Sequence, residues 1–381
     1  MMPALATHMP VVTTIAIGAF GGALFYALNL PLPWMLGAIV ITLVGTLAGW
    51  NLSGPERARP YVVAIIGVML GSGFKPDTFD HLDQWAVSLA GLVLCVAISA
   101  FVVHAYLHRI GGQSRVTALF SAMPGGIVEM VEIGRAQGGD EGAIILAHVW
   151  RIILVIAAIA FWFRWVLGHE VDGMMPLSPE PNGPLDLLIL GLCAVLGSAL
   201  GLGLKLPAPT FIGPVALSAA AHMVGITHGS PPLALVIIAQ VFLGTIVGCR
   251  FKGSQPADVF YALRLAIVST AIMMAVAAIT AWGVHALTGY STAQLLVAYA
   301  PGGVNEMSLV SLAIQADVAF VATHHLVRII VLLALAGTVL AKVASIMNRN
   351  RNQEPWFCDV LHLATLIDPH ADRPPSRTDT Q

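Results

Sequence analysis

Charged residues are scarce in this chain. Lys, Arg, Asp and Glu make up 10% of its 381 residues, and hydrophobic residues make up 57%. In a soluble domain about a quarter of the residues are charged. The mean hydropathy of +0.84 points the same way. The composition therefore excludes a soluble domain and predicts a polytopic membrane protein, whose main surroundings are the lipid bilayer.

Basic runs and paired cysteines are also missing. The net charge is -2 and no long basic run occurs, so the chain lacks the positive patch that nucleic acid binding needs. We expect no nucleic acid partner. The cysteines are scattered, without a Cys-x-x-Cys pair, and we interpret them as packing residues. They are Cys95, Cys193, Cys249 and Cys358.

The common enzyme motifs are absent as well. A di-iron helix bundle needs Glu-x-x-His motifs, and none occurs in this sequence. There is also no His-Glu-x-x-His zinc motif, no nucleophile elbow and no phosphate-binding loop. We therefore expect no catalytic residues, no bound metal and no cofactor.

The sequence does contain an internal repeat. Residues 124–130 read Pro-Gly-Gly-Ile-Val-Glu-Met, and residues 301–307 read Pro-Gly-Gly-Val-Asn-Glu-Met. The two copies are 177 residues apart, and the same offset relates Asp140 to Asp317, His148 to His325 and Arg151 to Arg328. Five polar or turn-forming features rarely align by chance at one offset.

Two further matching blocks extend the repeat over both halves of the chain. Residues 21–37 share their Gly, Leu and Pro positions with residues 197–213, and residues 67–75 match residues 244–252. A repeat of this length indicates two halves of one design. We predict a first membrane repeat at 1–168, an exposed linker at 169–184, a second membrane repeat at 185–348 and a cytoplasmic tail at 349–381, which is charged, then Pro-rich, and disordered at its end.

Ten apolar runs approach the length of about 20 residues that a membrane-spanning helix needs. The two segments that hold the Pro-Gly-Gly motifs, 116–138 and 293–315, are apolar but interrupted, and we interpret them as re-entrant hairpins or broken spans. The ten runs lie near 11–28, 34–52, 60–74, 85–107, 141–167, 185–204, 210–227, 232–251, 261–287 and 318–346.

The number of spans decides the symmetry of the two halves. Five spans in each half invert the second half relative to the first, whereas six leave both parallel. With ten spans and the N-terminus inside, only Lys75 and Arg164 clearly fall outside, which fits the cytoplasmic preference of Lys and Arg in short loops. We therefore predict an all-α polytopic membrane protein with two inverted repeats of about five transmembrane helices, and both termini in the cytoplasm.

The Pro-Gly-Gly motifs are the predicted functional site. Proline and glycine end a helix and leave backbone groups unpaired, which a membrane protein tolerates where protein or water supplies partners. Interrupted segments at equivalent places in two halves are typical of the midplane site of a transporter. The candidate residues of the two turns are Pro124, Gly125, Gly126, Pro301, Gly302, Gly303 and Asn305.

Glu129 and Glu306 are the first candidates for a function in this site. A carboxylate in apolar surroundings can carry a proton or bind a cation. The structural alternative is that each carboxylate caps or braces the broken helix. Asp140 and Asp317 precede the next helices, and we interpret both as helix caps.

Each motif is followed by a histidine and an arginine three residues apart, on one face of the next helix. Arg151 and Arg328 can hold a carboxylate substrate with two hydrogen bonds, or pair with the glutamate of their own motif. His148 and His325 can relay protons near neutral pH. A hydrogen bond to a neighbouring helix is the structural alternative for both.

The doubled Pro-Gly-Gly-x-x-Glu-Met, each copy followed by Asp and His-x-x-Arg, together with the Leu-Pro-x-Pro turns, resembles the bacterial AbrB membrane duplication family over residues 11–346. The resemblance implies a multi-pass protein of the bacterial inner membrane. Members of that family are labelled as transporters, as membrane regulators of gene expression or as ammonia monooxygenases.

Among these labels, the transporter fits the residues best. We predict a secondary active transporter of a small polar or anionic solute coupled to H+ or Na+, and a membrane regulator or sensor is the alternative. No copper- or iron-binding spacing supports a monooxygenase. The architecture also resembles, at the level of the fold, secondary transporters of the bile acid and arsenite type. The sequence leaves open whether the protein forms a homodimer.

Overall fold

The computed structural model describes residues 2–30, 32–74, 82–166, 183–206, 208–314 and 316–335. Over these ranges the chain is helical and contains no strand, which confirms the all-α prediction. Most of the predicted linker 169–184 and the whole tail 349–381 lie outside the described residues.

Five of the described helices are long and apolar enough to cross a membrane, by length and composition. This agrees with the predicted class of membrane protein. The five segments are Pro10–Ala27, Trp85–Arg109, Glu141–Trp165, Pro184–Gly203 and Pro256–Thr288. Shorter apolar helices are Pro33–Leu47, Leu233–Cys249 and Val318–Leu332.

The order of helices in the first half returns in the second half. Each half has two short helices in its fifth and sixth places, and these have 8 and 10 residues in both halves. The first half contains α1 (Met2–Ala27), α2 (Pro33–Leu47), α3 (Arg59–Gly71), α4 (Leu82–Arg109), α5 (Arg115–Ala122), α6 (Ile127–Ala136) and α7 (Glu141–Phe161). The second half contains α8 (Pro184–Gly203), α9 (Pro209–Met223), α10 (Leu233–Cys249), α11 (Pro256–Thr288), α12 (Thr292–Tyr299), α13 (Val304–Ala313) and α14 (Val318–Leu335).

The residue before the second proline of each Leu-Pro-x-Pro turn has the same backbone conformation in both halves. Leu32 before α2 and Ala208 before α9 are left-handed, with φ of 45° and 46°. A residue with a side chain rarely adopts this conformation. In each turn the following proline begins the helix, where its missing amide hydrogen costs nothing.

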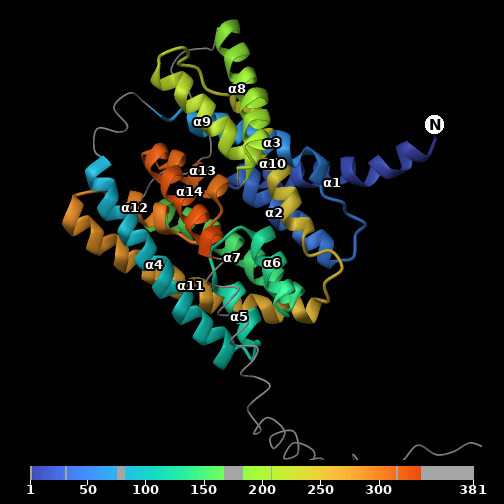
Figure 1. The fold of residues 1–381 in the computed structure, drawn as a ribbon. Coiled ribbons are helices and arrows are strands. Elements are labelled where there is room, and N and C mark those ends of the chain that lie inside the picture. Colours follow the sequence, from blue (N-terminus) through green and yellow to red (C-terminus); the bar gives the residue numbers. More distant parts are fainter. Residues whose placement is uncertain are drawn as a thin grey trace, which may run out of the picture.

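The helices form two bundles, and each bundle takes helices from both halves (Figure 1). We call α1–α3 with α8–α10 the first bundle, and α4–α7 with α11–α14 the second bundle. Within the first bundle α2 packs on α10 and α3 on α9, and within the second bundle α4 packs on α11. The bundles meet where α3 contacts α13 and α14 and where α2 contacts α7.

Glycine brings two helix pairs of the first bundle into backbone contact. A Cβ atom on Gly37 of α2 would meet the carbonyl oxygen of Gly21 in α1, and a Cβ atom on Gly213 of α9 would meet that of Gly197 in α8. Both approaches are closer than any real Cβ atom shows. Small residues allow close packing of this kind between membrane helices.

The Gly21–Gly37 contact gives a stability prediction. In Gly37→Ala the added methyl group overpacks the crossing, at a cost of about 1–3 kcal/mol, so we expect a lower midpoint of thermal unfolding for the detergent-purified protein. Gly191→Ala in α8 is the matched control, because its Cβ atom meets nothing within 4 Å. Equal midpoints for the two variants would contradict a tight crossing.

Candidate functional site

Each Pro-Gly-Gly sequence lies in a gap between two short helices of the second bundle. In the first half α5 ends at Ala122 and α6 begins at Ile127, and in the second half α12 ends at Tyr299 and α13 begins at Val304. The carbonyls at the end of the first helix and the amides at the start of the next have no partners within their own helices. These carbonyls and amides therefore need partners from other parts of the protein.

The two arginines satisfy the carbonyls. Arg151 of α7 donates from Nη1 to the carbonyl of Ser121, at 3.1 Å, and from Nη2 to that of Met123, at 3.2 Å. Arg328 of α14 donates in the same way to Ala300, at 2.7 Å, and Gly302, at 2.6 Å. A cation at the C-terminal end of a helix also complements its dipole. Both arginines are 4% exposed.

The two glutamates lie at the start of the next helices. Glu129 and Glu306 occupy the third position of α6 and α13 and fold back over the glycine that precedes each helix, Gly126 or Gly303. A Cβ atom on either glycine would collide with the carboxylate. A carboxylate in the first turn complements the positive end of the helix dipole. The glutamates therefore stabilise the second side of each gap.

The remaining residues of the motif have a packing role. A Cβ atom on Gly125 would lie 3.1 Å from Met130, and one on Gly302 would lie 2.8 Å from Met307. Met130 and Met307 are fully buried. The spacing Pro-Gly-Gly-x-x-Glu-Met thus follows from the turn, since the first glycine leaves room for the methionine and the second for the glutamate.

Both gaps line one cavity of about 430 Å³ between the two bundles. All six Pro-Gly-Gly residues, both glutamates and both arginines belong to its wall. The motifs lie far apart in the sequence, and the fold brings them to one place. The first bundle contributes the start of α3 and the start of α9, namely Arg59, Pro60, Val63 and residues 208–212.

The charges in the cavity do not form ion pairs with one another. Among the described residues the only salt bridge joins Arg135 to Glu141, at 3.6 Å, and lies outside this cavity. The proposed pairing of each arginine with the glutamate of its own motif is therefore not what the described residues show. The Nε atoms of Arg151 and Arg328 are buried and have no hydrogen-bond partner.

The histidines do not reach the cavity. Neither His148 nor His325 lines it, and both are fully buried. The Nδ1 atom of His148 lies 2.9 Å from the carbonyl of Ile144, and the Nε2 atom of His325 lies 3.0 Å from that of Val297. His325 thus has the expected hydrogen bond to a neighbouring helix, because Val297 belongs to α12, whereas the bond of His148 lies within its own helix α7.

The two aspartates are helix caps, as predicted. Asp140 accepts a hydrogen bond from the amide of Ala143, and Asp317 accepts one from the amide of Phe320, both at 3.0 Å. The side chain of Asn305 lies outside the described residues.

The part of the wall that comes from the first bundle was not predicted. Arg59 interacts electrostatically with Glu306, as does Arg250 at the end of α10. The signal that was available for Arg59 is a basic residue at the very start of an apolar run. For Ala208 to Phe211 the available signal is the Leu-Pro-x-Pro turn.

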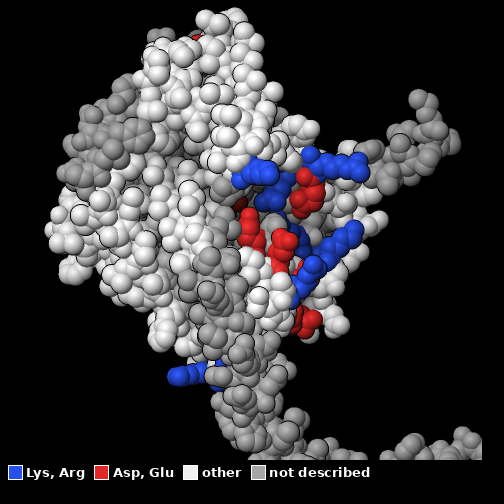
Figure 2. Space-filling view, in the orientation of Figure 1, with Lys and Arg blue, Asp and Glu red and all other residues white. Residues whose placement is uncertain are grey.

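A second cavity of about 400 Å³ adjoins the first at Ile127. It is lined by charged residues that include Glu132, Arg135, Glu141 and Arg250. Figure 2 shows that the charged side chains of this face gather mainly in one region, while the rest of its described surface is almost uncharged.

These features define a helical protein of membrane type with a polar cavity between two bundles. The model of the family described as "Transition state regulatory protein AbrB" matches residues 34–344, so the chain belongs to this family. The match confirms the resemblance predicted from the doubled motif.

Two curated relatives are similar over most of their length. "Uncharacterized protein YhjN" of Bacillus subtilis (strain 168) is 26% identical over 347 residues, which cover 84% of this chain and 90% of that protein. "Putative regulator AbrB" of Escherichia coli (strain K12) is 24% identical over 326 residues, which cover 84% of this chain and 92% of that protein.

The contact between Gly303 and Glu306 gives a prediction for a double-mutant cycle. Gly303→Ala places a methyl group against the carboxylate, at a cost of about 1–3 kcal/mol. In a Glu306→Ala background the same change meets no carboxylate and should cost less, with a coupling energy of about 0.5–3 kcal/mol in thermal or denaturant unfolding.

Gly283→Ala is the control for this cycle, because Gly283 lies in α11 with nothing within 4 Å of a Cβ atom. Its effect should be the same in both backgrounds. An unchanged cost of Gly303→Ala after removal of the carboxylate would mean that Glu306 does not occupy the space above Gly303.

Proposed function

We propose that this protein is a secondary active transporter of a small anionic solute, coupled to H+ or Na+. The observation that carries the proposal is the convergence of both Pro-Gly-Gly turns, both glutamates and both arginines on one cavity between two bundles. Helices interrupted at equivalent positions of two repeats are the recurrent design of transporter binding sites.

The balance of charge supports an anionic solute. Three arginines, Arg59, Arg151 and Arg328, and two glutamates line the cavity. With both glutamates ionised the wall carries one excess positive charge, and an arriving proton or cation increases that excess. The Nε atoms of Arg151 and Arg328 are buried without a hydrogen-bond partner among the described residues, and they become donors to a carboxylate once the side chains turn towards the cavity. A cavity of about 430 Å³ accommodates a small molecule.

Glu306 and Glu129 are the proposed carriers of the coupling ion. Glu306 is 8% exposed, so its charge has little water around it, and Glu129 is partly exposed in the same cavity. A buried carboxylate is the group whose protonation or cation binding a membrane protein can use. Capping of α6 and α13 is compatible with this function, because the bound ion then changes the charge at the start of each helix.

The proposed topology has five spans in each half, with the second half inverted and both termini in the cytoplasm of a bacterial inner membrane. Support comes from the repeated order of helices and from the packing of each half on the other within both bundles. Transport would follow from rocking of the second bundle against the first, which exposes the cavity between them alternately to the two sides.

The second candidate function is an integral membrane regulator or sensor. Its support is the wording of the family description and of the Escherichia coli relative, both of which refer to regulation. In that case the same cavity would bind a ligand without moving it, and the signal would leave through a cytoplasmic segment, for which the tail 349–381 is the candidate.

Glu306→Gln tests the transporter. The solute is first found by a thermal-shift screen of small carboxylates at several pH and sodium values, since a ligand of the native state raises its stability. For that solute we expect Glu306→Gln to abolish ion-driven uptake into reconstituted vesicles while the protein stays folded. Glu132→Gln, at an exposed glutamate without a counterpart in the second half, should keep its uptake. Full uptake by Glu306→Gln would remove Glu306 from the coupling mechanism.

Removal of residues 349–381 separates the two candidate functions. A transporter should keep the uptake of the screened solute in vesicles without this tail, whereas a regulator that signals through the tail should lose its effect on gene expression in cells. The measurement is uptake and expression response for the full and the shortened chain, side by side. Loss of uptake together with normal folding would count against the transporter.

A further inference from the structure

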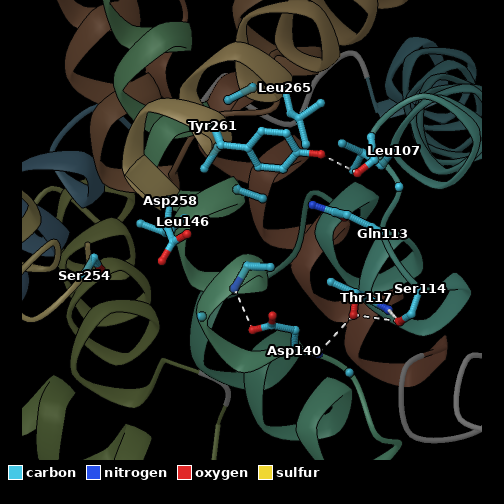
Figure 3. A pocket seen from close by; sticks show the side chains of 18 of the residues that line it. Leu107, Gln113, Ser114, Thr117, Asp140, Leu146, Ser254, Asp258, Tyr261 and Leu265 are labelled. Carbon is cyan, nitrogen blue, oxygen red and sulfur yellow. Dashed lines mark hydrogen bonds between the residues drawn. The ribbon is translucent and has the colours of Figure 1, made fainter. Parts of the chain in front are cut away.

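A larger cavity lies inside the second bundle, apart from the site described above. Its volume is about 910 Å³, and none of its lining residues lines the cavity between the bundles. It lies where α4 ends and where α5, α7 and α11 begin (Figure 3). The cavity therefore touches the ends of four helices.

Acidic and neutral polar groups form part of its wall. Asp140 precedes α7, and Asp258 and Tyr261 lie one turn apart on α11. In Figure 3 Gln113 and Asp258 lie on opposite sides of the cavity, and the ring of Tyr261 lies above them. The Oε1 atom of Gln113 is buried without a hydrogen-bond partner among the described residues. Among the described residues no Lys, Arg or His lines this cavity.

Three leucines form apolar parts of the wall. They are Leu107 of α4, Leu146 of α7 and Leu265 of α11. In Figure 3 Leu146 is beside Asp258 and Leu265 is beside Tyr261, so a ligand in this cavity meets polar and apolar groups side by side.

The other half of the chain fills the equivalent position with rings. By the offset of 177 residues, Ala143, Ala147 and Ala262, which line the cavity, correspond to Phe320, His324 and Trp85. The rings of Phe320 and His324 have centroids 4.0 Å apart, and those of Trp85 and Phe320 5.6 Å apart.

This ring cluster is fully built into the core. Nε2 of His324 lies 2.8 Å from the hydroxyl of Ser88, and Trp85, Phe320 and His324 are at most 4% exposed. The fold is therefore able to close this position with side chains. In the first half three alanines leave it open, so the cavity is a property of the sequence at that end and not a general consequence of the helix packing.

We propose that this cavity is a second ligand site, which binds a small organic cation with an ammonium or guanidinium group. One cationic group binds at Asp258, one turn from Tyr261 on α11, and the second cationic group of a dication binds at Asp140, on another side of the cavity. The apolar part of the ligand packs on the three leucines. An anion finds no basic partner in the wall.

Such a ligand connects helices that carry the central site. Asp140 caps α7, and the amide of Asp140 donates to the hydroxyl of Thr117 in α5, at 3.0 Å. The C-terminal carbonyls of α5 are held by Arg151 of α7. The cation therefore binds the starts of α7 and α11, and α7 is the helix whose Arg151 holds the end of α5 at the gap.

Binding of agmatine to the purified full chain, measured by isothermal titration calorimetry, tests the proposal. Agmatine supplies two cationic groups on a short apolar chain, and glutarate serves as an anion of similar length. We expect saturable binding of agmatine that weakens about tenfold or more in Asp258→Asn. Ala143→Phe, which places the ring of Phe320 in the equivalent position, should abolish it, and Ala143→Ser, which keeps the side chain small, should retain it.

The outcomes separate this site from the proposed transport site. Glu306→Gln should leave agmatine binding unchanged, whatever it does to uptake. Absence of agmatine binding to the unaltered protein, undiminished binding in Ala143→Phe, or loss of binding in Glu306→Gln would each overturn the proposal. If Ala143→Phe does not fold, Asp258→Asn decides, because Asp258 is exposed and its exchange leaves the core intact.

Discussion

The structure depends on how the protein supplies partners for backbone groups at two helix gaps in apolar surroundings. An unpaired peptide group there costs several kcal/mol, and each gap exposes carbonyls on one side and amides on the other. Arg151 and Arg328 bind the carbonyls, and Glu129 and Glu306 lie over the start of the following helices. The charges that make the gaps affordable are the same charges that line the cavity. The residues that stabilise the gaps therefore also line the proposed solute site.

This arrangement needs both halves of the chain. Each half supplies one gap, one arginine and one glutamate, while the wall opposite them comes from α3 and α9 of the first bundle. The halves also depart from each other where their surroundings differ. Three alanines that line the larger cavity correspond to three residues with rings in the other half of the chain. Glu306 is buried, whereas Glu129 is partly exposed. The two halves thus share a fold but differ in the side chains at these positions.

Much of the fold was predictable from the sequence, because helix gaps, caps and repeats are local patterns. The interruption around Pro124 and Pro301 and the capping by Asp140 and Asp317 follow from residue chemistry within a few positions. The partners of Arg151 and Arg328 were not predictable in this way. Spacing along α7 or α14 defines a face of the helix, but not the groups that this face contacts. Arg59 was missed for the same reason, as it reaches the site only through the packing of two bundles. The histidines share the face of the arginines, yet lie one turn away from the cavity.

The glycine crossings of the first bundle have a mechanical consequence. Where α1 meets α2 and α8 meets α9, backbone lies against backbone, with no side chains between them that can change rotamer. Close-packed contacts of this kind resist sliding. We therefore expect each helix pair to move as one rigid unit. Relative movement is then expected at the side-chain contacts between the bundles, where the cavity with the two glutamates lies.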